Sequence, residues 1–198
     1  KIGFINKKSG RLYYRIIFPV EETKEKVPVF FYVYGGPHVQ LITDKFGSST
    51  KGLEETMASS GFITFCIDPR GSANRGYEFE SAIYQQINRP QIEDYDDALD
   101  WFLKEYEGYV DKTKLFIYGW SFGGYISLSM LLNSRHRFKL GIAGGAVVDW
   151  RYYEVMYTER YMGERKDSEQ FYEKADLKEQ IGKLCTPVCL IHCDNDPV

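Results

Sequence analysis

The stretch "FIYGWSFGGYISLSMLL", residues 116–132, decides the fold because its periodicity changes abruptly at a serine. Residues 114–118 form a short apolar run of β-branched and aromatic side chains, which predicts a buried strand. Residues 125–132 are apolar on nearly every side, which predicts a buried helix. In the turn between them Ser121 stands between Gly119 and Gly123. A bulky side chain at either glycine would collide in so sharp a turn.

The pattern G-x-S-x-G between a strand and a helix is the nucleophile elbow of the α/β-hydrolase fold. Such a turn lifts the Ser121 hydroxyl clear of the sheet, and the following helix points its positive dipole end at it. A chance match in a loop is the alternative interpretation. The strand before the motif and the helix after it favour the elbow, with Ser121 as nucleophile.

Length and composition indicate one soluble globular domain spanning residues 1–198. Charged residues make up 27% of the chain and hydrophobic residues 43%. The net charge of -3 and the pI near 5.7 give no support for nucleic-acid binding. No apolar run approaches the about 18 residues that a membrane helix needs. The sequence begins "KIGFINKKSG" and stops at "CDNDPV", and we expect it to be a fragment of a longer polypeptide.

Strands alternate with helices along the chain, which predicts a mostly parallel, doubly wound α/β sheet. The expected strands are 11–20 (an antiparallel edge strand), 27–34, 62–68, 114–118, 138–147 and 187–193. The expected helices are 53–61, 90–106 and 125–132. The acidic run of Glu93, Asp94, Asp96 and Asp97 resembles a cation site. Its predicted place in the first turn of a helix, where carboxylates suit the dipole, favours a structural role.

Three cysteines recur at four-residue spacing in "CTPVCLIHC": Cys185, Cys189 and Cys193. The segment is predicted to be a buried strand, in which the thiols lie too far apart to share a tetrahedral ion. We therefore expect no metal site, and expect these cysteines to be buried small hydrophobic residues.

A nucleophilic serine needs an oxyanion hole, a base and a group that orients the base. In this fold one oxyanion donor is the backbone N–H after the nucleophile, here that of Phe122, and the other comes from the loop after the third strand. In that loop, residues 34–38, Tyr34 offers a phenolic donor. The alternative, a core tyrosine at the end of a strand, stays open at this point.

The order of the triad in this fold is serine, then an acid, then histidine. The predicted last strand is followed by Asp194 and Asp196, which are the candidate acids. All three histidines of the chain precede Asp196: His38, His136 and His192. None of them is therefore in place to be the triad base.

An aromatic set follows the strand after the elbow: Trp150, Tyr153 and Tyr157. Their spacing of i, i+3 and i+7 predicts one face of a helix. Such a stripe can be core packing, or it can be a flat wall for a compact apolar ring such as proline, because ligands bind at the carboxyl ends of α/β strands. Glu154 on the same helix is left to pair with a bound cation or with Arg151 or Arg160.

Five segments together resemble the catalytic domain of the prolyl oligopeptidase family of serine peptidases, and within it the dipeptidyl peptidase IV and prolyl tripeptidyl peptidase branch. They are "YVYGGPH", "DPRGSANRG", "GWSFGGY", "VVDWRYYEVMYTERYMG" and "IHCDNDPV". The resemblance runs from about residue 12 to residue 198. One local departure is Cys193, where the family usually has glycine beside the acid loop.

The resemblance implies that Ser121 is the nucleophile, Asp196 the triad acid, and Tyr34 with the Phe122 amide the oxyanion hole. It also implies a pocket for the residue before the scissile bond, formed by Phe122, Val147, Trp150, Tyr153 and Tyr157. Peptides would be cleaved after proline or alanine near a free N-terminus, through an acyl-enzyme and without a cofactor.

The same resemblance implies that an N-terminal β-propeller, the last strand and the triad histidine lie outside this chain, which alone would then be inactive. It suggests a homodimer of the full-length protein and a periplasmic or extracellular location, with a cytoplasmic one as the alternative. Two other functions stay open: an esterase or other acyl hydrolase on the same fold, and a non-catalytic binding homologue.

Overall fold

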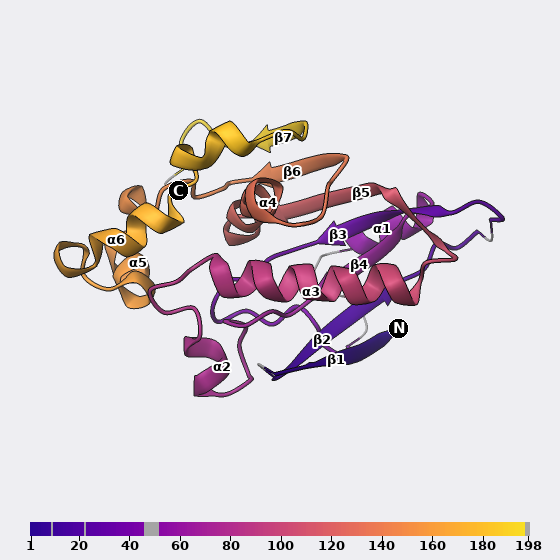
Figure 1. The fold of residues 1–198 in the computed structure, drawn as a ribbon, viewed down its shortest axis with the longest axis horizontal. Helices are drawn as coiled ribbons and strands as arrows, with labels where there is room; N and C mark the ends of the chain where they lie inside the picture. Colours follow the sequence, from indigo (N-terminus) through magenta and orange to yellow (C-terminus); the bar gives the residue numbers. More distant parts are fainter. Residues whose placement is uncertain (9, 22, 46–51, 197–198) are drawn as a thin grey trace.

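The computed structural model describes residues 1–8, 10–21, 23–45 and 52–196. These residues form a seven-stranded sheet of order β1-β2-β4-β3-β5-β6-β7 (Figure 1). The strands are β1 Ile2–Lys7, β2 Gly10–Ile17, β3 Val27–Tyr32, β4 Ile63–Ile67, β5 Val110–Trp120, β6 Leu140–Gly144 and β7 Val188–Ile191. The neighbouring pairs β4–β3, β3–β5, β5–β6 and β6–β7 are parallel. The pairs β1–β2 and β2–β4 are antiparallel. The predicted α/β-hydrolase arrangement is confirmed.

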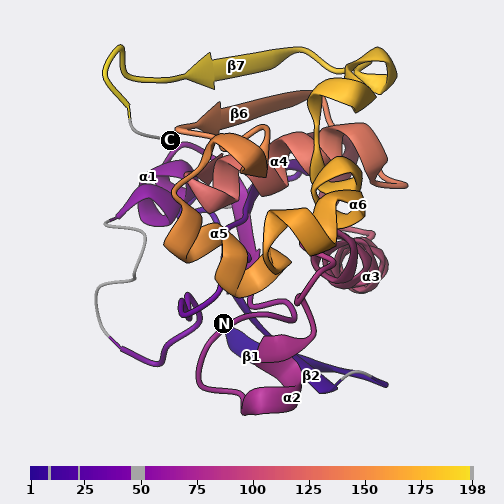
Figure 2. The same cartoon turned by 90° about the vertical axis from the view of Figure 1, so that its left-hand side faces the viewer.

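Helices cover both faces of the sheet, as the doubly wound pattern requires. Figure 2 shows α1 on one side of the sheet and α3 on the other. The helices are α1 Leu53–Ser59, α2 Tyr77–Ser81, α3 Arg89–Glu105, α4 Phe122–Asn133, α5 Val155–Met162 and α6 Arg165–Ala175, with 3-10 turns η1 Trp150–Tyr152 and η2 Lys178–Lys183. No described helix is long and apolar enough to cross a membrane.

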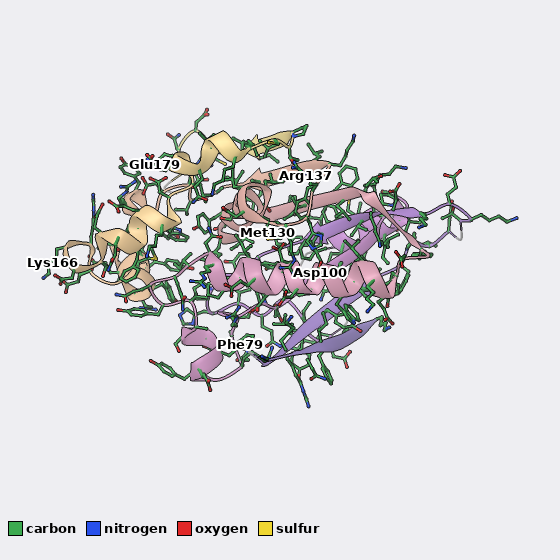
Figure 3. The ribbon with its side chains drawn as sticks, viewed as in Figure 1. Phe79, Asp100, Met130, Arg137, Lys166 and Glu179 are labelled. Carbon is green, nitrogen blue, oxygen red and sulfur yellow. The ribbon has the colours of Figure 1, made fainter. Side chains whose placement is uncertain are left out.

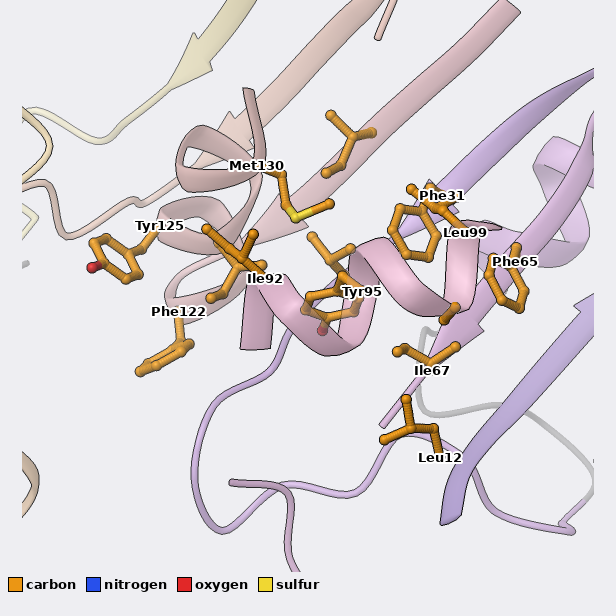
Figure 4. Packing of buried hydrophobic residues seen from close by; sticks show 14 of the residues in the cluster. Leu12, Phe31, Phe65, Ile67, Ile92, Tyr95, Leu99, Phe122, Tyr125 and Met130 are labelled. Carbon is orange, nitrogen blue, oxygen red and sulfur yellow. The ribbon is translucent and has the colours of Figure 1, made fainter. Parts of the chain in front are cut away.

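Stacked aromatic rings join the sheet to α3. Phe65 of β4 stacks on Phe102 of α3 with ring centroids 4.4 Å apart and on Phe31 of β3 at 5.3 Å. Tyr95 of α3 meets Phe31 edge-on (Figure 4). Figure 3 shows how polar side chains such as that of Lys166 point outward, whereas Met130 of α4 is fully buried. The central strands are covered on both sides, which explains their unbroken apolar sequences.

The predicted edge strand at 11–20 is wrong in its place. β2 lies between β1 and β4, and among the described strands β1 is the outermost on that side. β1 was not predicted, although three of its six residues are apolar: Ile5 is buried, whereas Ile2 and Phe4 are each 44% exposed. The short helix α2 was likewise missed inside a segment read as a polar loop.

The acidic run also has a different role from the one predicted. α3 begins at Arg89, so these carboxylates lie beyond its first turn. Glu93 and Asp94 pair with Arg70, and the two following aspartates, Asp96 and Asp97, pair with Arg135. Salt bridges to neighbouring segments therefore explain the run. No cluster that could hold a metal ion occurs in the described part of the chain.

The last strand is exposed, contrary to the prediction of a buried one. Within the described residues β7 pairs only with β6, and Leu190 and Ile191 are 65% and 42% exposed. Cys185, Cys189 and Cys193 are exposed as well, so the interpretation of these three as buried thiols is wrong. The apolar sequence of β7 predicts burial, but the described elements leave much of this strand exposed.

Candidate active site

Ser121 occupies a sharp turn between β5, which ends at Trp120, and α4, which begins at Phe122. Its backbone has φ 56° and ψ -120°, a left-handed conformation that residues with a side chain rarely adopt. The Ser121 N–H donates to the Gly144 carbonyl at 2.8 Å, and its carbonyl accepts from the Tyr125 N–H at 3.1 Å. The side chain does not cap the helix. The strained backbone is characteristic of a functional turn.

Close backbone approaches explain the glycines around the serine. A Cβ on Gly119 would lie 2.1 Å from the Gly123 carbonyl oxygen, and one on Gly123 would lie 2.4 Å from the Val33 carbonyl oxygen. A Cβ on Gly124 would lie 2.5 Å from the Gly144 carbonyl oxygen. Because these obstacles are backbone atoms, they cannot rotate away. The elbow is thus packed directly against the ends of β3 and β6.

The loop after β3 brings Tyr34 to the elbow. β3 ends at Tyr32, and Tyr34 lies beyond it with its N–H donating to the Tyr95 hydroxyl at 3.2 Å. The Tyr34 ring lies 6.2 Å from the Phe122 ring, centroid to centroid. Gly36 makes room for both rings, since a Cβ there would lie 2.6 Å from Tyr34 Cε1 and 3.0 Å from Phe122 Cγ. Tyr34 is half-buried in a loop, which differs from the core-strand alternative.

The Tyr34 hydroxyl is suited to donate a hydrogen bond. Burial, and secondarily the nearby Tyr153, raises the pKa of this phenol, so it is protonated at neutral pH. No hydrogen bond of the hydroxyl to another described residue is present. The donor thus remains available for a ligand at the elbow.

The predicted aromatic stripe forms a wall, but not on one helix. Trp150 lies in η1, Tyr153 is extended and Tyr157 lies in α5. The rings nevertheless pack together: Trp150 stacks on Tyr157 at 6.2 Å and meets Tyr153 edge-on at 5.9 Å. Trp150 also contacts Phe122, with ring centroids 5.3 Å apart. The wall therefore begins beside the nucleophile turn.

The two outer tyrosines of this wall are accessible. Trp150 is 1% exposed, whereas Tyr153 and Tyr157 are only half-buried. Burial raises the pKa of Tyr157, which keeps its phenol neutral. Val147, also predicted for the pocket, is buried, and with Tyr153 it lines a cavity of about 300 Å³ toward β7.

Glu154 caps α5 rather than pairing with an arginine. Its carboxylate accepts hydrogen bonds from the Met156 N–H at 2.9 Å and the Tyr157 N–H at 2.7 Å. Carboxylates are favourable at this position of a helix. Among the described residues Glu154 pairs with neither Arg151 nor Arg160, and it orients the turn that carries Tyr157; its pairing with a bound cation stays a prediction.

An ion network that sequence analysis missed holds the base of the wall. Asp149 accepts from Arg151 Nε at 2.8 Å and pairs with Lys178 at 2.7 Å, and Arg151 also pairs with the buried Asp176. Burial alone would raise the pKa of Asp149, but the hydrogen bonds from Arg151 and Lys178 lower it to about 2. The sequence "DWR" is compatible with the local pair of Asp149 and Arg151. Asp176 and Lys178 are distant in the chain, so no sequence pattern connects them to this pair.

Asp196 follows β7, at the carboxyl end of the sheet where the elbow also lies. Its Oδ2 lies 3.8 Å from His192 Nε2 and 3.7 Å from the place a Cβ on Gly145 would take. The structure thus brings His192 to Asp196, a contact the sequence did not predict. The other two histidines are engaged elsewhere: His38 packs on Tyr161, and His136 lies 3.2 Å from Asp100.

The sequence is similar to those of several dipeptidyl peptidases. Mouse dipeptidyl peptidase 8 is 36% identical over 160 residues, which cover 81% of this chain and 18% of the mouse protein. A probable dipeptidyl-aminopeptidase B of Arthroderma gypseum is 38% identical over 162 residues, covering 79% of this chain and 17% of the fungal one.

Solved structures agree over nearly the whole chain. A putative dipeptidyl aminopeptidase IV from Bacteroides ovatus has a TM-score of 0.91 and 38% identity, covering 97% of this chain and 27% of that one. For Porphyromonas gingivalis dipeptidyl peptidase 4 the TM-score is 0.87 and the identity 29%, with the same coverage. The chain therefore spans about a sixth to a quarter of the length of these relatives. Since the model of the prolyl oligopeptidase family also matches residues 49–198, the chain belongs to the prolyl oligopeptidase family.

Proposed function

We propose that this chain carries the catalytic centre of a serine peptidase that releases short N-terminal peptides after proline or alanine. The observation that supports this most is the convergence at the elbow. The strained Ser121, the Tyr34 hydroxyl and the aromatic wall beginning at Phe122 and Trp150 come from separate segments and meet at one end of the sheet.

Each residue then has a defined role. A histidine that follows Asp196 in the triad order takes the proton of the Ser121 hydroxyl, and Asp196 orients it. The Ser121 oxygen attacks the carbonyl carbon of the scissile bond. The Tyr34 hydroxyl and the Phe122 N–H donate to the resulting oxyanion. As the first residue of α4, Phe122 has an N–H without an intrahelical acceptor.

The second half of the cycle restores the enzyme. The histidine gives its proton to the leaving amine, so the peptide bond breaks and an ester on Ser121 remains. A water molecule, deprotonated by the same histidine, then attacks the ester. The histidine returns this proton to the Ser121 oxygen as the ester bond breaks, and the peptide leaves with a carboxylate. All charge develops on side chains of the full-length protein, on its backbone and on the substrate, so the cycle requires no cofactor.

The aromatic wall supports a preference for proline. Trp150, Tyr153 and Tyr157 offer flat apolar faces of fixed orientation, which suit a compact ring better than a flexible chain. The printed names of the relatives, dipeptidyl peptidase and dipeptidyl-aminopeptidase, support release of dipeptides. Glu154 would act on the substrate indirectly, by capping the turn that presents Tyr157.

The decisive experiment is Ser121→Ala in the full-length protein, assayed with a chromogenic proline dipeptide and a fluorophosphonate probe. We expect turnover and labelling to be lost. Ser59→Ala, at an exposed serine whose hydroxyl bonds only within α1, serves as the matched control and should behave as wild type. Undiminished labelling of Ser121→Ala would place the nucleophile elsewhere. Turnover of small esters without turnover of proline peptides by the wild type would favour an esterase.

A further inference from the structure

Trp120, which directly precedes the nucleophile, packs its indole onto the backbone of β6. The ring is so close that a Cβ on Gly144 would lie 2.0 Å from Trp120 Cε3 and 2.3 Å from Cζ3. The contact continues onto Gly145, where a Cβ would lie 3.6 Å from Trp120 Nε1. Despite this packing, Trp120 remains 43% exposed. One face of the indole therefore packs on Gly144 and Gly145, and the opposite face is exposed.

The same glycine pair links the nucleophile to the loop after β7 that carries Asp196, here called the acid loop. The Gly144 carbonyl accepts the hydrogen bond from the Ser121 N–H at 2.8 Å, and the Gly145 N–H donates to the Ile191 carbonyl of β7 at 2.8 Å. Asp196 Oδ2 lies 3.7 Å from the same Gly145 position that Trp120 Nε1 approaches. The Trp120 ring and the Asp196 carboxylate thus converge on one point of the backbone.

We propose that Trp120 and Gly144 form a coupled pair of positioning residues, in which glycine is needed at 144 so that the Trp120 indole can lie between the nucleophile turn and the acid loop. The inference rests on the proposed function, since it concerns how Ser121 and Asp196 are held relative to each other. Trp120 acts by holding Ser121 and Asp196 in position and does not contact the substrate.

Sterics set the expected response to a larger residue. Carbon atoms in contact sit about 3.5–4.0 Å apart, so a methyl group on Gly144 would force the indole to move by more than an ångström. The ring is partly exposed and can swing outward, whereas the paired backbones of β5 and β6 cannot separate easily. We therefore expect Gly144→Ala to displace the ring while leaving the sheet intact.

A double-mutant cycle in the full-length protein tests the coupling. We expect Gly144→Ala and Trp120→Ala each to lower kcat by about tenfold with a smaller change in KM, because a misplaced catalytic group mainly affects the chemical step. The double variant should be no worse than Trp120→Ala, since the added methyl group then has no ring to displace.

Gly141→Ala in the same strand is the matched control. There the new methyl group would lie 2.4 Å from Leu131 Cδ1, the movable end of a half-buried side chain. We expect kinetics within about threefold of wild type, because the leucine can change rotamer. A loss equal to that of Gly144→Ala would show that any substitution in β6 is harmful and would overturn the specific pairing.

A second readout does not depend on activity. Acrylamide quenching of tryptophan fluorescence should increase in Gly144→Ala, and should be unchanged between Trp120→Ala and the double variant. Additive kinetic losses, a wild-type Gly144→Ala, or unchanged quenching would each overturn the proposal. If Gly144→Ala fails to fold, the double variant should fold, and its failure would also overturn it. A wild-type protein without peptidase activity would refute the proposed function while the quenching still reports on the pair.

Discussion

Tyr34→Phe separates a catalytic hydroxyl from a packed ring, because it removes one oxygen and leaves the contact with Phe122. The ring continues to fill the space above Gly36, with its centroid 6.2 Å from that of Phe122. No described residue hydrogen-bonds the hydroxyl, so no hydrogen bond within this part of the structure is lost. We therefore expect the free energy of unfolding to change by less than about 1 kcal/mol.

The effect on catalysis should be much larger. Loss of one oxyanion donor typically lowers kcat by about 10²–10³, which corresponds to about 2.7–4 kcal/mol of transition-state stabilisation. Because burial raises the pKa of Tyr34, the phenol donates throughout the neutral range and the defect should not vary between about pH 6 and pH 8. KM should change little, since the bond forms in the transition state.

The assay is steady-state turnover of a proline dipeptide by the full-length variant, with its melting temperature measured in parallel. Tyr118→Phe is the matched control: this tyrosine is also half-buried, and burial raises its pKa, but its ring stacks on Phe30 and Tyr32 of β3. We expect wild-type kinetics from it. A Tyr34→Phe variant with wild-type kcat would refute the assignment and return Tyr34 to a packing role.

Three further predictions follow from the same contacts. Gly123→Ala places a methyl group 2.4 Å from the Val33 carbonyl oxygen, so the elbow must move by about an ångström and kcat/KM should fall by about 10²; Gly108→Ala, with no atom within 4 Å of its new Cβ, should not change it. Tyr157→Ala should weaken hydrolysis after proline more than after alanine, and an equal loss with a large fall in melting temperature would favour core packing. Asp149, whose pKa is lowered from 3.8 to about 2, should contribute about 2 kcal/mol of stability above pH 4 that is lost as the pH falls toward 2. Urea unfolding of Asp149→Asn should lack this pH dependence, and a parallel pH profile for both proteins would contradict the ion-network assignment.

Local sequence was sufficient for the central sheet and for the elbow. Strands covered on both faces are apolar at nearly every position, so β3 and β4 can be recognised within a few residues. The elbow is equally local in its signature. Its glycines follow from the sharp turn at Ser121, although the atoms that exclude a side chain, such as the Val33 carbonyl oxygen, belong to another strand.

Exposure could not be predicted, because it depends on which segments pack together. β7 has the composition of a buried strand and yet is exposed in the described structure. β1, by contrast, was not predicted, and it forms a strand by pairing antiparallel with the backbone of β2. The sequence of a strand therefore does not determine which elements pack against it.

The arrangement of the candidate site could not be predicted from the sequence either, because it also depends on which segments pack together. Sequence spacing placed Trp150, Tyr153 and Tyr157 on one helix, but the backbone reaches the same ring packing through a 3-10 turn, an extended residue and a helix. The partners of Asp149 and the contact of Trp120 with Gly144 join residues that only the packed sheet brings together. Sequence alone indicated the turn at Ser121, because the glycines around it and the change from strand to helix periodicity are local features. Which of those residues meet was decided by long-range packing, in which side chains from distant segments compete for the same space.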